Sequence, residues 1–543
     1  MARQRHPLVS GAGITSLGTL ASRVLGMVRD MATAALLGLS GGGVMDAFAV
    51  AFRIPNLFRR LFGEGALAAS YLPVLTAEFE RDRRSAWRLA SVVLTWLSVL
   101  LVALVVLAEL ACGIAWLAWG DSPQAGLLLG LTAVMLPYVF FICVAAQASA
   151  TLHALSEFTV PALVPAVLNI FWLAAAGVAV VATDDKSLQA CIMAASIVAS
   201  GVVQLAIQLR TLRWFGFRYD YDWPAVRDRV WEIVAALGPM VLGLAITQIN
   251  TLLDSLLAWG LSTSPGEERT IAWLGGISYP MQQGAAAAVY YGERLYQFPL
   301  GMLGVAVATA IFPLLSRHAA RGDRRQLAAD LTLGLRLVVF LGLPASAGLI
   351  LLATPLAQAL FEHGEFTAED TRRTASMIAW YATGVWAYCA VPVVVRGYYA
   401  MADRATPVKV GLATVGFNVL LNAVSIWPLA EKGLAISTSL AAAFHVLVLV
   451  ALFSRRKSAL GWRSLGTTVG RTAVATALMI TAAWLVLIAL PGGSGLTREL
   501  ARLLAPLAAG VAVFFVAYAA MGGRELRILL GEIEEDIAKL QEF

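Results

Sequence analysis

The feature that most limits the fold of this chain is a series of apolar runs, each long enough to cross a lipid bilayer. Because the hydrocarbon core of a bilayer is about 30 Å thick, a spanning helix needs roughly 20 apolar residues. The 543-residue chain is 59% hydrophobic and 14% charged, whereas a typical soluble domain is about 25% charged. A water-soluble fold is excluded, and we expect an all-α polytopic membrane protein.

The apolar runs continue along the whole chain and leave no room for a separate soluble domain. A window of membrane-span length predicts about fourteen transmembrane helices. These predicted spans cover 10–38, 44–76, 88–119, 126–151, 159–183, 188–211, 231–261, 279–316, 327–353, 370–400, 406–428, 433–454, 470–491 and 500–521. The first run carries Arg23, Arg29 and Asp30 and lacks the short apolar core of a cleavable signal, so we expect it to remain as a helix.

The connections between the predicted spans alternate between rich and poor in Lys and Arg. The connections at 81–88, 210–229, 317–325 and 455–463 are rich, whereas 39–44 contains neither residue. Since cytoplasmic loops carry the excess of positive charge, the rich set is predicted to be cytoplasmic, and with an even number of spans so are both termini. The net charge of +6 is then an orientation signal, and a nucleic-acid partner is not expected.

The chain also contains a weak internal repeat. Segment 150–171 aligns with 395–416, and 47–75 aligns with 287–315 at a similar offset. The agreement predicts two pseudo-symmetric six-helix lobes, the arrangement from which many alternating-access transporters are built. An accidental match between Ala-rich helices is the alternative. The predicted parts are the first lobe, the second lobe, two extra helices and a cytoplasmic amphipathic tail, at 1–216, 217–458, 459–522 and 523–543.

The first two predicted spans contain many charges, although each charged side chain at the bilayer centre costs roughly 2.5–3.5 kcal/mol on insertion scales. In the second span a single helical stripe, with Arg59 beside it, is formed by Asp46, Arg53, Asn56, Arg60 and Glu64. Pro55 is expected to bend this span. We therefore expect a water-filled cavity rather than a lipid-facing surface.

Further charges extend this predicted cavity. The first span contributes Ser22, Arg23, Arg29 and Asp30, and the second lobe contributes the neighbouring pair formed by Glu293 and Arg294. Because the planar guanidinium of Arg donates paired hydrogen bonds and stays charged, an arginine-rich wall favours a phosphate or pyrophosphate cargo. The alternative is that Arg29, Asp30, Asp46 and Glu64 only form ion pairs that fix helix packing.

Other candidate sites are few. Asp254 is the one charged residue within 233–261 and could bind a cation or a proton, or serve as a hydrogen-bonded packing residue. The chain has no HExxH motif and no Walker loop, and its five histidines are widely separated. No catalytic residues, metal site or cofactor are expected, although coupling to the membrane potential or to a monovalent cation stays open.

Four stretches closely resemble the MurJ/MviN family of lipid II flippases. They are SRVLGMVRD (22–30), DAFAVAFRIPNLFRRLFGEGALAASYLPVL (46–75), YYGERLYQFPLGMLGVAVATAIFPLLS (290–316) and DRATPVKV (403–410). The resemblance implies the fold of the multidrug/oligosaccharidyl-lipid/polysaccharide transporter superfamily, with two six-helix lobes and two extra helices that form a groove for the lipid tail.

The resemblance also implies a function in bacterial cell-wall synthesis. Lipid II, a disaccharide-pentapeptide on undecaprenyl pyrophosphate, would pass from the cytoplasmic to the periplasmic leaflet of the inner membrane, with cell-wall synthesis proteins as further candidate partners. By matching motif positions, Arg23, Arg29, Asp46, Arg59, Arg60 and Arg294 would form the polar cavity, with Ser22 and Glu64 at its gate or headgroup contacts.

Two features depart from the family pattern. The connection 262–284 is longer than expected and could be a lid or a tolerated periplasmic insertion, and Glu293 stands where an aspartate is common. Competing interpretations are a cation-coupled drug exporter, a membrane glycosyltransferase or ligase, and a structural scaffold. The arginines argue against the exporter and the scaffold. An enzyme would need a nucleophile or base in a large outer loop, and the longest outer loop contains neither His nor Cys.

Overall fold

The structure is a computed structural model that describes residues 7–63, 66–263, 270–271, 275–456, 460–491 and 495–529. The chain divides into two compact units: unit 1 is Met1–Ala287 with His363–Phe366, and unit 2 is Ala288–Glu362 with Thr367–Phe543. Four two-residue strands apart, the regular elements of the described residues are helices. The lobe boundaries expected after residues 216 and 458 remain predictions.

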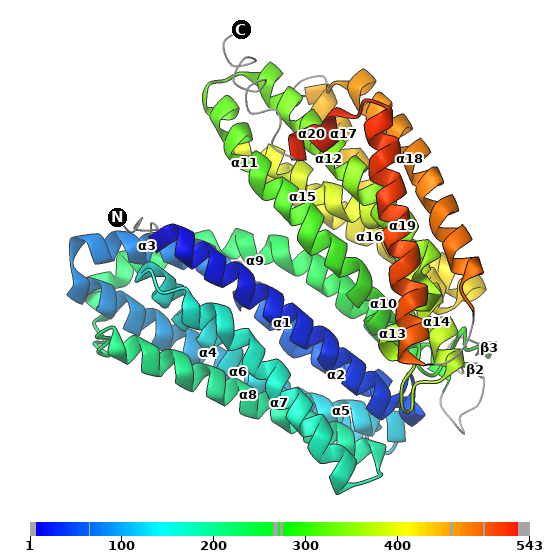
Figure 1. Cartoon of the computed structure of the whole chain (residues 1–543). Helices are drawn as coiled ribbons and strands as arrows, with labels where there is room; N and C mark the ends of the chain where they lie inside the picture. Colours follow the sequence, from blue (N-terminus) through cyan, green and yellow to red (C-terminus); the bar gives the residue numbers. More distant parts are fainter. Residues whose placement is uncertain are drawn as a thin grey trace, which may run out of the picture. The chain divides into compact units, whose positions relative to one another are not determined.

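Unit 1 is built mainly from long apolar helices (Figure 1). The Asp82 carboxylate accepts hydrogen bonds from the backbone N–H groups of Arg84 and Ser85 and so starts one of them. The elements are α1 (Pro7–Leu37), η1 (Gly41–Gly43), α2 (Val44–Phe58), η2 (Arg59–Gly63), α3 (Ala66–Arg81), α4 (Arg83–Trp119), α5 (Pro123–Met135), α6 (Pro137–Ala154), α7 (Thr159–Ala182), α8 (Lys186–Trp214) and α9 (Trp223–Gly260). Helix α7 packs between α1 and α8, while α9 packs on α2, α3 and α4.

The connection 262–284 contains four short strands in its described part. They are β1 (Ser262–Thr263), β2 (Thr270–Ile271), β3 (Ile277–Ser278) and β4 (Met281–Gln282). Strand β1 pairs in parallel with β4, and β2 pairs in antiparallel fashion with β3. The described part of the connection is therefore folded locally, and its interpretation as a lid or a tolerated insertion stays a prediction.

Unit 2 also consists of helices. Its elements are α10 (Ala285–Pro299, whose first three residues belong to unit 1), η4 (Leu300–Gly304), α11 (Val305–Ala320), α12 (Arg324–Leu351), α13 (Ala353–Phe361), α14 (Ala368–Ala382), α15 (Val385–Ala400), α16 (Ala405–Leu429), α17 (Glu431–Arg456), α18 (Trp462–Ala489), α19 (Leu496–Ala520) and α20 (Arg524–Leu529). Helix α12 packs against α11, α15 and α18, and α18 lies beside α19. A buried cluster of mainly Val, Leu and Ala side chains joins α11, α12, α15 and α17.

The two aligned repeat segments 47–75 and 287–315 share an unusual backbone feature. A π-helical turn follows α2 at Arg59–Gly63, and another follows α10 at Leu300–Gly304. Each is preceded by a proline, Pro55 inside α2 and Pro299 at the end of α10. Because proline removes a backbone donor, a local shift of the hydrogen-bond register is expected near it. The shared π-turn supports an origin of the two segments by duplication.

A loop from the second half of the chain packs into unit 1. The Glu365 N–H donates to the Ala35 carbonyl at 2.9 Å, and Lys186 lies 3.2 Å from the Glu365 carboxylate. Gly364 has φ +60°, and a Cβ atom there would lie 2.3 Å from the Ala35 oxygen, so the close approach requires glycine. These contacts explain why His363–Phe366 belongs to unit 1.

Each of the fourteen predicted spans overlaps a helix, but fewer helices qualify as spans. Within the described residues, ten helices are long and apolar enough to cross a membrane, by length and composition. Two bent pairs, Leu20–Leu37 with Gly41–Phe62 at 95° and Ala368–Ala382 with Val385–Ala400 at 41°, would raise the number to twelve. A polytopic helical protein is therefore confirmed, whereas the number fourteen remains a prediction.

Candidate functional site

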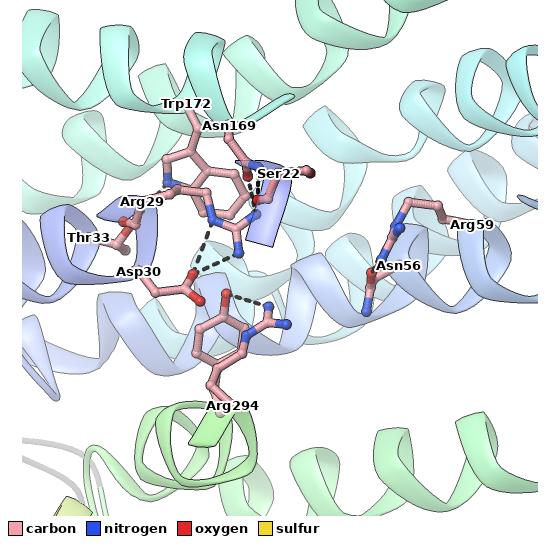
Figure 2. Close-up of polar contacts among 10 residues, drawn as sticks. Ser22, Arg29, Asp30, Thr33, Asn56, Arg59, Asn169, Trp172 and Arg294 are labelled. Atoms are coloured by element: carbon pink, nitrogen blue, oxygen red, sulfur yellow. Dashed lines mark hydrogen bonds and ion pairs between the residues drawn. The ribbon is translucent and has the colours of Figure 1, made fainter. Parts of the chain in front are cut away.

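Arg29, on α1, is held by contacts on several sides (Figure 2). Its Nε and Nη2 atoms donate to Asp30 Oδ1 at 3.1 and 2.7 Å, and Nη1 donates to Asn169 Oδ1 at 3.1 Å. The guanidinium carbon also lies 4.5 Å from the ring centroid of Trp172, which is cation–π geometry. Arg29 and Asp30 are 6% and 3% exposed, so their charges neutralise each other inside the unit.

Helix α7 supplies the partners of this ion pair. Asn169 also donates through Nδ2 to the Ser22 carbonyl at 3.0 Å, and thus links two turns of α1. Trp172 donates from Nε1 to the Thr33 hydroxyl at 3.0 Å. Asn169 and Trp172 were not predicted from the sequence, although an amide inside the apolar run 159–183 is a signal that could have identified Asn169.

The arrangement has two consequences for the chemistry of Arg29. A guanidinium has five N–H donors, and three are used by Asp30 and Asn169. Arg29 therefore keeps donors with which it could bind a phosphate. The buried ion pair also supports the packing interpretation, and the two interpretations make different predictions when the pair is replaced as a unit.

The polar stripe of α2 continues into the π-turn. Arg59 donates from Nε and Nη2 to Asn56 Oδ1 at 3.2 and 2.9 Å. Arg53, Asn56, Arg59 and Arg60 are all half-buried, in contrast to the buried apolar residues on the first half of α2. The stripe therefore presents three guanidinium groups at a partly accessible face. Glu64, predicted at its end, lies outside the described residues.

Asp46 makes contacts of another kind. Its carboxylate accepts backbone N–H groups of Gly284 at 2.6 Å and Ala287 at 2.9 Å, at the first turn of α10. A carboxylate at a helix N-terminus satisfies unpaired donors and interacts favourably with the helix dipole. The residue is 2% exposed, so in this structure it stabilises the start of α10. Its place in the cavity wall stays a prediction.

The remaining predicted residues belong to three other parts of the sequence. Arg23 is exposed on α1. In unit 2, Arg294 donates to the Tyr290 hydroxyl at 2.8 Å and lies over the ring of Tyr290 at 4.6 Å, while the neighbouring Glu293 is 3% exposed. Asp254, on α9, is 1% exposed. Tyr290 was also missed by the sequence analysis.

The cytoplasmic charges predicted from the sequence form a surface network. Arg88 donates to Asp220 at 3.0 Å and also pairs with Asp222 at 3.0 Å. The hydrogen bond from Arg88 holds the pKa of Asp220 below its ordinary value. Such exposed pairs contribute little to stability. They lie near the start of α4 and just before α9, outside the cluster around Arg29.

In the part of the chain that the structure describes, no group of three or more His, Cys, Asp or Glu side chains could hold a metal ion.

A family model described as "Lipid II flippase MurJ" matches residues 33–503. The chain belongs to the MurJ family. It is 33% identical to the "Probable lipid II flippase MurJ" of Vibrio cholerae over 462 residues, which cover 81% of this chain and 82% of that protein.

Solved structures support the same fold. One, titled "Lipid II flippase MurJ, inward closed conformation", has a TM-score of 0.74 at 22% identity and covers 94% of this chain and 99% of its own. An inward-facing multidrug resistance MATE family transporter of the MOP superfamily has a TM-score of 0.62 at 14% identity, over 80% of this chain and 95% of its own. The predicted resemblance to the MurJ family is confirmed.

Membership in the MurJ family decides the broad class of the protein. The family is one of transporters and not of enzymes, so the glycosyltransferase or ligase interpretation is dropped. Together with the apolar helices, it makes the chain a multi-pass protein of the bacterial inner membrane. The MATE likeness concerns the fold alone and gives no support to drug export.

Proposed function

We propose that this protein moves lipid II from the cytoplasmic to the periplasmic leaflet by alternating access, with both termini in the cytoplasm. The observation that carries the proposal is the match to the lipid II flippase family over residues 33–503. The charge pattern of the connections supports the orientation. Peptidoglycan synthesis is the process that such a flippase serves.

The arginines of MurJ-like motifs would bind the headgroup. Arg53, Arg59 and Arg60 lie half-buried on α2 and η2, and Arg29 and Arg294 are held in place by hydrogen bonds and aromatic rings. Guanidinium groups bind pyrophosphate oxygens in a paired geometry and stay charged at neutral pH. An arginine side chain that is already fixed before the ligand arrives loses less conformational entropy on binding.

Unit 2 contains an apolar cavity suited to the lipid tail. Its volume is about 300 Å³, and it lies among α12, α13, α18 and α19. Its walls include Phe340, Gly348, Met479, Pro506, Gly510 and Phe514. This volume is at the lower end of ligand pockets, so it would hold a segment of a long polyprenyl chain. The cavity supports the groove predicted in 459–522.

Transport by alternating access requires that the helices change their arrangement. The π-turns at Arg59–Gly63 and Leu300–Gly304 are natural places for such bending, because π-turns interrupt regular helix hydrogen bonding. Moving one charge across the membrane changes the free energy by about 2.3 kcal/mol per 100 mV of membrane potential. The potential would therefore favour opposite movements of a cationic empty cavity and of a cavity loaded with an anion. We propose coupling to this potential, with Asp254 as the residue to test for a cation.

The experiment that tests the proposal is a depletion and rescue. In cells depleted of the protein, lipid II should become trapped in the inner leaflet, and wild type should restore its outward exposure. Arg29→Ala should not restore it, whereas the matched control Arg88→Ala, a surface arginine of the cytoplasmic network, should. Outward exposure that is unchanged by depletion would refute the proposal and favour the scaffold or exporter interpretation.

A further inference from the structure

Helix α20, the last helix of the described residues, carries a buried carboxylate that the proposed mechanism does not use. Glu525 is 1% exposed. It accepts hydrogen bonds from Arg336 Nε at 2.8 Å, Thr468 Oγ1 at 2.6 Å and the Tyr518 hydroxyl at 2.6 Å, and Arg336 Nη2 lies 2.7 Å away. These donors come from α12, α18 and α19, so one side chain connects three helices of unit 2.

The chain turns sharply to place this carboxylate. Gly522, with φ +69°, donates its N–H to the Ala519 carbonyl, and Gly523 donates to the Tyr518 carbonyl at 3.2 Å. A Cβ atom on Gly523 would lie 2.0 Å from Cε1 of Tyr518, so only glycine fits. This is a glycine stop of the kind that ends many helices. It returns the chain beneath the Tyr518 ring.

The electrostatics favour a charged, fixed Glu525. Burial alone would raise the pKa of its carboxyl, but the hydrogen bonds from Thr468, Tyr518 and Arg336 outweigh burial and hold the pKa below its ordinary value. A buried ion pair is stable when its remaining hydrogen-bonding capacity is satisfied. The number of donors here meets that condition.

The same residues border the apolar cavity. Phe340 lies one helical turn after Arg336 and lines the cavity. The ring centroid of Phe340 lies 4.4 Å from that of Tyr518 and 5.4 Å from that of Phe514, which also lines the cavity. The aromatic rings therefore separate the cavity from the Glu525 cluster.

We propose that Glu525 is a positioning residue that holds α18 and α19 against α12 and thereby fixes the aromatic end of the cavity for the polyprenyl chain. The inference rests on the proposed function, because it takes the lipid tail as the occupant. Glu525 itself does not touch the lipid and acts through Tyr518 and Phe340.

The test uses the full chain in nanodiscs, with undecaprenyl phosphate as the probe. For Glu525→Gln we expect the Kd to rise about tenfold. The matched control is Glu431→Gln, which breaks another, partly buried ion pair of unit 2, Arg373 Nε to Glu431 Oε1 at 3.0 Å. It should lower the unfolding temperature similarly and leave the Kd within about twofold. Tyr518→Phe, which keeps the ring and loses one donor, should raise the Kd about threefold and serves if Glu525→Gln does not fold.

Each outcome of this binding experiment supports or overturns the proposed role of Glu525. If Glu525→Gln folds and binds the probe as wild type does, or if it and Glu431→Gln weaken binding equally, Glu525 has only a structural role and the inference is overturned. If wild type itself does not bind the probe, the cavity does not hold the tail and the inference also falls. Lipid II exposure in the depletion experiment would still judge the proposed flippase function separately.

Discussion

Replacing Asp30 by Asn tests what the buried ion pair of α1 contributes. Removing one partner of a buried pair typically costs about 3–5 kcal/mol, because the other charge is left uncompensated. In Asp30→Asn the new amide oxygen can still accept from Arg29, which also keeps its bond to Asn169 and its contact with Trp172. We therefore expect a loss of about 2–4 kcal/mol in the free energy of unfolding, a factor of roughly 30 to 700.

The assay is denaturant unfolding in mixed micelles, with the double variant Arg29→Leu/Asp30→Asn as comparison. The double variant removes both charges, so it should recover most of the lost stability. It should nevertheless fail to restore lipid II transport, because the cation that binds the headgroup is missing. A cost below about 0.5 kcal/mol for Asp30→Asn would refute the energetic reasoning, and transport by the double variant would show that Arg29 is only a packing residue.

Three further changes test other parts of the structure. Asp46→Ala should lower the free energy of unfolding by about 1–2 kcal/mol, since it removes the acceptor at the first turn of α10, and thermal unfolding measures this. Gly523→Ala should destabilise the protein through collision with Tyr518, whereas Gly470→Ala, where an added Cβ would meet nothing within 4 Å, should not. The pKa of Glu525 in the folded state is depressed. The stabilisation that the charged Glu525 carboxylate gives the fold should therefore be full above about pH 4.3, the ordinary pKa of Glu, and be lost as the pH falls through the folded-state pKa. The difference in free energy of unfolding between wild type and Glu525→Gln should shrink in acid.

Helices could be predicted at every one of the fourteen positions because apolar runs of membrane-span length favour helices. The arginines of the candidate site could also be predicted, because a charge within an apolar run is costly in a membrane and therefore indicates a functional site. The partners of these arginines could not be predicted. Asn169 is 140 residues from Arg29, and no local pattern connects them.

Two acidic residues show why spacing alone is insufficient. Asp46 lies on the stripe predicted for α2, yet its acceptor role depends on Gly284, which is 238 residues away. Glu525 belongs to the tail that was predicted to be amphipathic and cytoplasmic, yet Arg336, which is 189 residues away, pairs with it inside unit 2. In both cases tertiary packing decides what a face of a helix meets.

The most direct test of the central claim is reconstitution of the purified full chain in liposomes that contain fluorescent lipid II in one leaflet. The account predicts that wild type moves lipid II to the other leaflet, and that Arg29→Leu/Asp30→Asn, although folded, does so no faster than protein-free liposomes. Equal rates for wild type and protein-free liposomes, under an imposed membrane potential as well as without one, would contradict the account.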